Sequence, residues 1–290
     1  GEIMQALSVQ PGERVADCTL GYGGHAAELL KAVQPGGCLL GVDQDPIELP
    51  KTEARLRSAG FPAESLRCER TNFVALRSVL GQIGWHEGAD AILADLGVSS
   101  MQIDNPARGF SFKHQGPLDM RMNPNKGVSA SALIRKLDAP ELANLLRENA
   151  DEPNAALLAS ALANQEFETT GELARAIAQA LPKHFDEDRI KLSQRLVFQA
   201  LRIAVNDEFQ VLDGWLRGLP DCLRPGGRVA VLTFHSGDDR RVKKAFQSGL
   251  ADGLYSAISE SVIRASSSEK YDNPRASSAK LRWAVRAPSP

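Results

Sequence analysis

The feature that most constrains the fold is a short apolar run that ends in an acidic residue and a glycine–serine loop. Ala91–Ala94 is followed by Asp95 and by the stretch Leu96-Gly-Val-Ser-Ser-Met-Gln102. Such runs are typical of buried parallel strands, whose carboxyl ends open into a ligand crevice. Taken alone, the pattern fits an ordinary strand end with a capping aspartate equally well. Its place between a strand–helix alternation and a long insertion makes it the first position at which to expect chemistry.

This interruption predicts a discontinuous domain. We expect residues 1–105 and 206–290 to form one α/β domain, and residues 106–205 to form an inserted helical domain for substrate recognition. A length of 290 residues, 43% of them apolar, is enough for two ordinary domains with full cores. The expected sheet is mostly parallel, with an antiparallel pair of strands at its end.

The strands after the insertion come from the last quarter of the chain. Arg228–Phe234 has the composition of a core strand, and the stretches 254–265 and 280–287 alternate in the manner of an antiparallel pair. The stretch 266–279 between them is expected to be a polar loop.

Within the insertion, helical periodicity covers the stretches 129–150, 154–181 and 190–212, with a new helix opening at Thr170 or Gly171. The segment 105–122 has no period, but it contains too many large apolar residues for disorder.

A glycine loop follows the first predicted strand, Arg14–Leu20. Gly21-Tyr-Gly-Gly24 leads into a helix over His25–Val33. Glycines let the backbone approach a ligand closely, and the start of a helix offers free N–H groups. Because only part of a Gly-x-Gly-x-x-Gly pattern is present, the dinucleotide-binding signature is weak.

The second predicted strand, Cys38–Asp43, also ends in an acid, about 20 residues after the glycine loop. This is the place of an acid that accepts hydrogen bonds from a ribose diol, and it disfavours a 2′-phosphate. We assign that role to Asp43 and interpret Asp45 as the cap of the next helix. Phe73, just past the third strand, is placed to stack on an adenine, although a lone phenylalanine is more often part of a core.

The order strand–glycine loop–helix, strand–acid, strand, strand–Asp favours an S-adenosylmethionine-dependent methyltransferase over a dehydrogenase. The sequence has neither a Walker lysine nor a Gly-x-Ser-x-Gly elbow, which argues against an NTPase and a hydrolase.

The sequence gives no indication of a metal site or a membrane segment. Its five histidines have no metal-ligand spacing, so no metal is expected. No apolar stretch approaches the roughly 20 residues of a membrane helix, so no membrane partner is expected. Four scattered cysteines suggest free thiols in a reducing compartment.

Charge is unevenly distributed along the chain. Residues 1–105 carry 8 basic and 14 acidic side chains, whereas residues 236–290 carry 10 basic and 6 acidic ones. A basic C-terminal segment on an acidic protein is compatible with a nucleic-acid partner, and a solvated charged face explains it equally well.

Several long motifs resemble the RsmH (MraW) family of S-adenosylmethionine-dependent methyltransferases. The matching stretches are Thr19-Leu-Gly-Tyr-Gly-Gly-His25, Asp95-Leu-Gly-Val-Ser-Ser-Met-Gln102, Arg108-Gly-Phe-Ser-Phe112, Gly116-Pro-Leu-Asp-Met-Arg-Met122, Phe198-Gln-Ala-Leu-Arg-Ile-Ala-Val-Asn-Asp-Glu208, Pro225-Gly-Gly-Arg-Val-Ala-Val231, Phe234-His-Ser236 and Asn273-Pro-Arg-Ala-Ser-Ser-Ala-Lys-Leu-Arg282. The resemblance runs from about residue 12 to 284. It implies a Rossmann-like class I methyltransferase fold that binds S-adenosyl-L-methionine.

The resemblance also implies site residues. The implied cofactor contacts are Gly23, Gly24, His25, Asp43, Phe73, Asp95 and Gln102. Of these, only Gln102 was not marked by the residue patterns themselves. Asp95 is in addition the candidate catalytic residue, because an acceptor for the amino hydrogens of a cytosine would make N4 a better nucleophile. The carbonyl group of Leu96 is an alternative acceptor, and Phe110 or Phe112 could stack on the base, although packing in a core is the more common role of such residues.

The family implies transfer of a methyl group to N4 of a cytidine in the decoding region of small-subunit (16S-type) ribosomal RNA. The partner is then the small ribosomal subunit or its rRNA, in the cytoplasm or, if a targeting peptide precedes residue 1, in an organelle. A homodimer is compatible with the sequence.

The chain departs from the family pattern at Asn149-Ala-Asp-Glu152, Lys191-Leu-Ser-Gln-Arg195 and His235-Ser-Gly-Asp-Asp-Arg240, segments that bear on substrate positioning. Two alternatives therefore stay open. One is a non-catalytic RNA- or ribosome-binding assembly factor that retains the fold, and the other is an amino-methyltransferase with another nucleic-acid target.

Overall fold

The computed structural model describes residues 1–288, except for the side chains of residues 268, 272, 274 and 275. The chain divides into two compact units, one formed by Gly1–Gly97 with the chain from Phe209 onward, and the other by Val98–Glu208. In the described part of the chain, no helix is both long and apolar enough to cross a membrane. The use of the second unit in substrate recognition stays a prediction.

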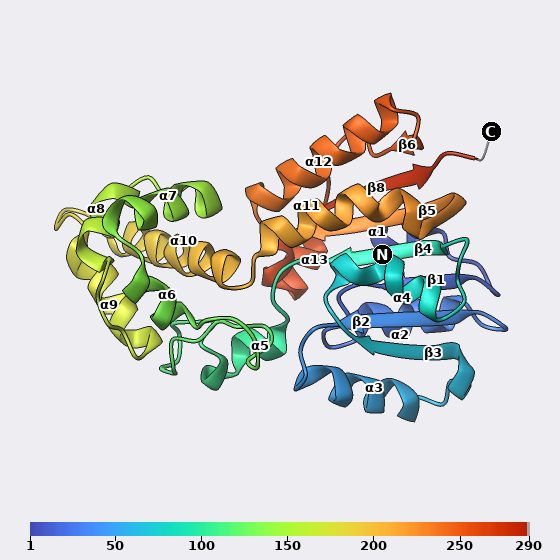
Figure 1. The fold of residues 1–290 in the computed structure, drawn as a ribbon, viewed down its shortest axis with the longest axis horizontal. Helices are drawn as coiled ribbons and strands as arrows, with labels where there is room; N and C mark the ends of the chain where they lie inside the picture. The colour runs from blue at the N-terminus through green and yellow to red at the C-terminus, as the bar shows by residue number, and fades with distance from the viewer. Residues whose placement is uncertain (289–290) are drawn as a thin grey trace. The chain divides into compact units, whose positions relative to one another are not determined.

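The first unit is built on a sheet with the strand order β3-β2-β1-β4-β5-β8-β6, with β7 paired to β8 (Figure 1). The strands are β1 (Arg14–Asp17), β2 (Cys38–Asp43), β3 (Leu66–Arg70), β4 (Ala89–Asp95), β5 (Leu223–Thr233), β6 (Tyr255–Ile258), β7 (Ile263–Arg264) and β8 (Lys280–Arg286). The pairs among β1 to β5 are parallel, and every pair that involves β8 is antiparallel. The sheet confirms the expected Rossmann-like class I methyltransferase fold.

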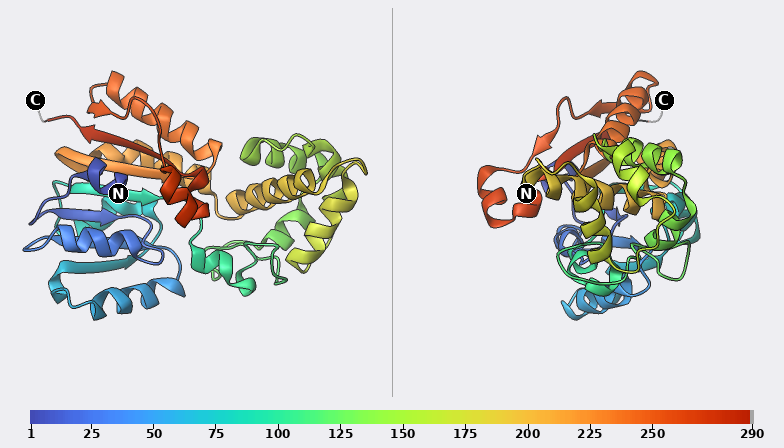
Figure 2. Two further views of the ribbon diagram at one scale, coloured as in Figure 1. Left: turned by 180° about the vertical axis from the view of Figure 1, so that it is seen from behind. Right: turned by 90° about the vertical axis from the view of Figure 1, so that its left-hand side faces the viewer.

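Helices cover both faces of this sheet (Figures 1 and 2). The helices of the unit are α1 (Glu2–Leu7), α2 (Gly24–Ala32), α3 (Glu48–Ser58), α4 (Leu76–Gln82), α11 (Glu208–Gly218), α12 (Ser236–Ala251) and α13 (Ser267–Asp272), with short 3-10 turns at Ala63–Ser65, Phe73–Ala75, Leu219–Cys222 and Pro274–Ser278. Apolar side chains of α4, α11 and α12 form one core with one face of the strands. Those of α1, α2 and α3 form a second core with the other face. The central strands β1, β2 and β4 are buried along most of their length, which explains their nearly continuous apolar sequences.

The second unit is helical. Its helices are α5 (Ser100–Asp104), α6 (Ala130–Lys136), α7 (Ala139–Ala150), α8 (Ala155–Leu162), α9 (Thr170–Ala180) and α10 (Glu187–Val205), with a 3-10 turn at Pro106–Arg108. One apolar core joins α6 to α10, and it includes Leu118 and Met120 from the aperiodic segment. Buried Arg108 orders that segment by donating hydrogen bonds to the carbonyl oxygens of Arg121 and Met122.

The expected single helix over 190–212 is wrong. The helix is interrupted between α10 and α11, where Asp207 has a left-handed φ of 50°. The side chain of Asn206 accepts a hydrogen bond from the N–H of Met122 and donates one to the carbonyl oxygen of Met120, which fixes the break. The expected helical stretch 129–150 is likewise two helices, because Asp138 forms a capping box with Glu141 and starts α7. The later helix opening at Thr170 is confirmed.

Three further expectations in the last quarter of the chain are wrong in detail. The stretch 254–265 forms two short strands, β6 and β7, rather than one. The expected polar loop 266–279 contains α13, whose start is capped by the hydroxyl of Ser266, which accepts a hydrogen bond from the N–H of Glu269. The core strand β5 begins five residues earlier than expected, at Leu223 instead of Arg228.

Candidate functional site

Three carboxylates lie at the carboxyl ends of adjacent strands. Asp17 ends β1, Asp43 ends β2 and Asp95 ends β4. Because β1 is hydrogen-bonded between β2 and β4, the three side chains are brought to one edge of the sheet. The sequence prediction included Asp43 and Asp95 but not Asp17. The sequence offered the same pattern at Asp17, which is an acidic residue at the end of a short apolar run.

Burial and mutual repulsion disfavour the charged forms of these acids. Burial, with a smaller contribution from the charge of Asp43, raises the pKa of Asp17 to about 7. Burial and the charge of Asp17 likewise raise the pKa of Asp95 to about 7. Burial also raises the pKa of Asp43, although hydrogen bonds from backbone N–H groups oppose the shift. The edge is therefore suited to a cationic ligand, whose charge would favour ionised carboxylates.

The two oxygens of Asp95 have different surroundings. Oδ1 is buried and has no hydrogen-bond partner among the described residues. Oδ2 lies 3.6 Å from Nε2 of His25, and the side chain as a whole is 31% exposed. Burial lowers the pKa of His25, which favours its neutral form near pH 7. A buried acceptor without a partner is rare in folded proteins, so Oδ1 is available to a donor from a bound ligand or water.

The glycine loop lies beside Asp95 at the start of α2. Gly23 has a φ of 81°, and a Cβ at this position would lie 2.8 Å from Cγ2 of Thr52. A Cβ on Gly24 would meet no atom within 4 Å. Gly23 is thus required by the fold of the loop, whereas Gly24 leaves open space beside the first turn of the helix, where backbone N–H groups are free.

The carboxylate of Asp43 holds the turn around the glycine loop. Oδ2 accepts a hydrogen bond from the N–H of Gly21 at 2.9 Å, and Oδ1 accepts one from the N–H of Asp45 at 2.9 Å. Each oxygen keeps further lone-pair capacity for a ligand hydroxyl group. Asp45 is not the N-cap residue of α3, which is Ile47, but its carboxylate accepts hydrogen bonds from the N–H groups of Ile47 and Glu48 at the start of this helix.

The three phenylalanines that were candidates for stacking on a base pack against the hydrophobic cores. Phe73 is partly buried against the first core, and its ring meets that of Trp215 edge to face, with 5.6 Å between the centroids. Phe110 and Phe112 pack against the core of the helical unit, where Phe112 contacts Phe198. This packing is the common role of such residues and gives no support to stacking on a base.

Gln102 belongs to the helical unit, at α5. Its side chain and that of Ser99 form a capping box, in which Oε1 of Gln102 accepts a hydrogen bond from the N–H of Ser99 at 3.0 Å. Gln102 is 6% exposed. It therefore stabilises the loop that follows Asp95 in the sequence, and its contact with a cofactor stays a prediction.

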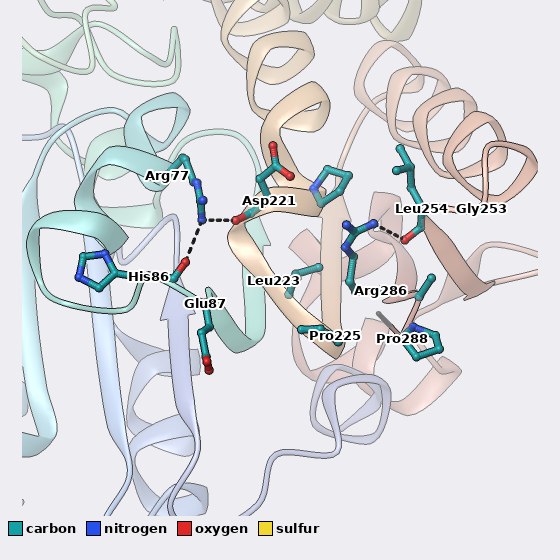
Figure 3. Close-up of a pocket in the computed structure, with 12 residues that line it drawn as sticks. Arg77, His86, Glu87, Asp221, Leu223, Pro225, Gly253, Leu254, Arg286 and Pro288 are labelled. Atoms are coloured by element: carbon teal, nitrogen blue, oxygen red, sulfur yellow. Dashed lines mark hydrogen bonds between the residues drawn. The ribbon is translucent and has the colours of Figure 1, made fainter. Parts of the chain in front are cut away.

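A cavity of about 340 Å³ lies at the opposite edge of the sheet, where β4 and β5 begin (Figure 3). None of the predicted site residues lines it. Nη1 of Arg77 donates hydrogen bonds across it to the carbonyl oxygens of His86 and Asp221. On its other side, Arg286 donates a hydrogen bond to the carbonyl oxygen of Leu254. Among the side chains that the structure describes, no group of three His, Cys, Asp or Glu residues is placed to hold a metal ion.

Comparison with known proteins identifies the family of this chain. "Ribosomal RNA small subunit methyltransferase H 2" of Alkaliphilus metalliredigens is 48% identical over 295 residues, covering 99% of this chain and 83% of the relative. "Ribosomal RNA small subunit methyltransferase H" of Symbiobacterium thermophilum is 39% identical, with coverage of 98% and 94%. A solved S-adenosylmethionine-dependent O-methyltransferase from Thermotoga maritima aligns with a TM-score of 0.44 at 12% identity, covering all of this chain and 64% of that one. The family profile described as the MraW methylase family matches residues 1–287, and the chain belongs to this family of S-adenosylmethionine-dependent methyltransferases.

Proposed function

We propose that this protein transfers the methyl group of S-adenosyl-L-methionine to N4 of a cytidine in the decoding region of small-subunit ribosomal RNA. Family membership and the names of the relatives support an rRNA substrate. The observation that carries the assignment of the site is the buried, unpartnered Oδ1 of Asp95 beside the glycine loop. An acceptor in this position fits an amino group as the nucleophile.

The residues at the sheet edge fit the cofactor. We assign the ribose diol to Asp43, whose two oxygens accept backbone N–H groups of the surrounding turn and keep lone-pair capacity for ligand hydroxyl groups. The open space at Gly24 suits the close approach of the amino-acid end of the ligand, and the carboxylates of Asp17 and Asp95 suit its positive charge. Gly23, His25, Phe73 and Gln102 complete the proposed contacts. When bound, S-adenosylmethionine supplies a methyl group already activated by the sulfonium, so the protein mainly positions the reactants and excludes water.

The role of Asp95 follows from the chemistry of the cytosine amino group. The N4 lone pair is conjugated with the ring, and a hydrogen bond from the amino group to Oδ1 of Asp95 makes it more available for attack. On receiving the methyl group, N4 would have one proton to lose, and the carboxylate of Asp95 would accept it. A carboxylate whose pKa is about 7 is matched to this transfer near neutral pH. The carbonyl oxygen of Leu96 is the alternative acceptor.

The decisive experiment measures methyl transfer from labelled S-adenosylmethionine to small ribosomal subunits that lack their native methylation, followed by mass analysis of the nucleosides. Appearance of N4-methylcytidine at a decoding-region position supports the proposal. Label in another nucleoside would assign a different target base. Binding of cofactor and subunits without transfer would favour a non-catalytic assembly factor.

A further inference from the structure

An exposed tyrosine lies in the glycine loop itself. Tyr22 is 58% exposed, although few large apolar or aromatic side chains of the described chain are so open to solvent. It is held between Gly21 and Gly23, which have φ values of 48° and 81°. Glycine adopts these left-handed φ values without steric strain, so the two flanking glycines permit the tight turn on which the exposed Tyr22 side chain lies.

Arg55 from α3 fixes this ring in place. Its guanidinium carbon lies 3.7 Å from the centroid of the Tyr22 ring, a cation–π contact. Nη2 of Arg55 also donates hydrogen bonds to the carbonyl oxygen of Tyr22 and, at 3.1 Å, to the hydroxyl of Thr52. That hydroxyl donates a 2.5 Å hydrogen bond to the carbonyl oxygen of Gly21. The aromatic ring and the cation are therefore organised before any ligand arrives.

The charge of Arg55 is not neutralised. Its neighbours on α3 are paired, Lys51 with Glu48 at 3.2 Å and Arg57 with Glu53 at 2.7 Å. No carboxylate in the described part of the chain forms an ion pair with Arg55. An exposed aromatic ring next to an unpaired guanidinium is the combination that proteins use to stack a base and contact its phosphate.

Tyr22 of this pair belongs to the loop that carries the proposed cofactor contacts Gly23, Gly24 and His25. Tyr22 is three residues from His25, whose Nε2 lies 3.6 Å from Oδ2 of Asp95. We propose that Tyr22 and Arg55 bind a nucleotide of the RNA substrate next to the target cytidine, with its base stacked on the Tyr22 ring and its phosphate contacted by the Arg55 guanidinium. This inference rests on the proposed function for its choice of ligand. A cytidine drawn out of its stack leaves a neighbouring base exposed, and the ring offers that base a new partner.

The test measures RNA binding directly, so it does not depend on turnover. Two short single-stranded RNAs of the decoding-region sequence carry 2-aminopurine on the 5′ or the 3′ side of the target cytidine, and unmethylated small subunits serve as a second probe. Wild-type protein is expected to quench one of the two fluorescent RNAs. Tyr22→Leu should lose this quenching and bind both probes about tenfold more weakly, whereas Tyr22→Phe should retain both properties.

Charge is tested with a matched pair on one helix. Arg55→Gln should weaken binding and lower the slope of log affinity against log salt concentration by roughly one. Arg57→Gln removes a cation already paired with Glu53 and should leave that slope unchanged. Calorimetric titration with S-adenosylmethionine should give the same affinity for all of these variants.

The possible failures are distinct. Wild-type quenching without N4-methylation would refute the proposed reaction and leave the nucleotide site standing. Methylation with unchanged RNA binding and unchanged KM for subunits in Tyr22→Leu would overturn the nucleotide site. A loss confined to cofactor affinity would also overturn it, since Tyr22 would then only support the glycine loop. No binding of wild-type protein to either probe would overturn it as well.

Discussion

The backbone N–H of Asp95 donates a 2.6 Å hydrogen bond to the hydroxyl of Thr19. The same hydroxyl donates to Oδ1 of Asp17 at 3.5 Å, and that oxygen also accepts the N–H of Thr19 at 3.0 Å. Because Asp17 ends β1 and Asp95 ends β4, Thr19 connects two neighbouring strand ends. It sets the backbone from which the proposed catalytic carboxylate extends.

Thr19→Val should therefore impair transfer through the position of Asp95. The substitution keeps the shape of the side chain but leaves the N–H of Asp95 without its acceptor, which should lower the free energy of unfolding by about 1–3 kcal/mol. We expect a fall in kcat of at least about tenfold, because small misplacements of a reacting group are costly. Single-turnover methylation and urea denaturation measure the two effects. Thr19→Ser keeps the hydroxyl and is the control, and a valine variant with normal kcat would show that Thr19 has no positioning role.

Asp95→Asn should separate catalysis from binding. The amide preserves size but cannot accept the proton from N4, so transfer should fall by roughly 10²- to 10⁴-fold. Circular dichroism and binding to small subunits should match the wild-type protein. Asp95→Ala should also fold and lose transfer. Turnover at the wild-type rate by either variant would remove Asp95 from the mechanism.

Asp43→Ala should mainly weaken cofactor affinity, by at least about tenfold, through the loss of the ribose contact. Asp43 also accepts hydrogen bonds from the N–H groups of Gly21 and Asp45, so its loss could weaken binding through the loop as well. Calorimetry should therefore compare the affinity of S-adenosylhomocysteine with that of its 2′,3′-dideoxy analogue, which lacks the ribose hydroxyl groups. The substitution should affect the first ligand far more than the second, and equal losses would assign Asp43 to loop structure alone.

The two loop glycines should respond differently to alanine. In Gly23→Ala, the alanine would have to adopt a φ of 81° and would place its Cβ 2.8 Å from Cγ2 of Thr52. The substitution should therefore lower the free energy of unfolding by about 1–3 kcal/mol. Gly24→Ala meets no protein atom and should leave stability nearly unchanged. Its methyl group instead enters the proposed cofactor space and should reduce S-adenosylmethionine affinity. Thermal unfolding measures the stability of the two variants, and calorimetry measures their affinity for S-adenosylmethionine. Wild-type affinity in Gly24→Ala would show that the space beside Gly24 is not part of the cofactor site.

The sequence pattern predicted those site residues that follow directly from a local rule. An apolar run ending in an acid and a turn identified Asp43 and Asp95, because a parallel strand is buried along its length and opens to ligand at its end. Asp17 obeys the same rule, but the apolar residues Cys18 and Leu20 follow it, and the strand was therefore expected to continue to Leu20. Only the pairing of β1 with its neighbours shows that the strand ends at Asp17.

Features that depend on distant contacts could not be predicted in this way. The apolar period continues across Asn206 and Asp207, so nothing in the helical pattern marks the break between α10 and α11. The break is fixed by bonds from Asn206 to Met120 and Met122, more than 80 residues away. Helix α13 was missed for the opposite reason, because it is polar and has no apolar period, and only its capping Ser266 indicated a helix start.

The buried carboxylate of Asp17 should make the protein less stable as pH rises. Its pKa is about 7 in the folded protein and about 3.9 in an unfolded chain, so between these values the folded state binds more protons. The free energy of unfolding therefore falls as pH increases from about 4 to 7, and the full penalty applies above 7. Asp17→Asn removes this penalty and should raise the free energy of unfolding at pH 8 by on the order of 2–4 kcal/mol, with little difference at pH 4.

Urea denaturation of both proteins across this pH range measures the effect on the free energy of unfolding.

The pH dependence of cofactor binding is a second measurement on the same cluster of carboxylates, because a cationic ligand favours the ionised forms of Asp17 and Asp95. S-adenosylmethionine should bind more tightly as pH rises from 6 to about 7.5 and should release protons on binding, as shown by calorimetry in buffers of different ionisation enthalpy. Asp17→Asn should release fewer protons than the wild-type protein. Identical pH profiles of stability and equal proton release in the two proteins would mean that Asp17 is already ionised near neutral pH in the folded state, and the cofactor would then meet a fully charged carboxylate edge.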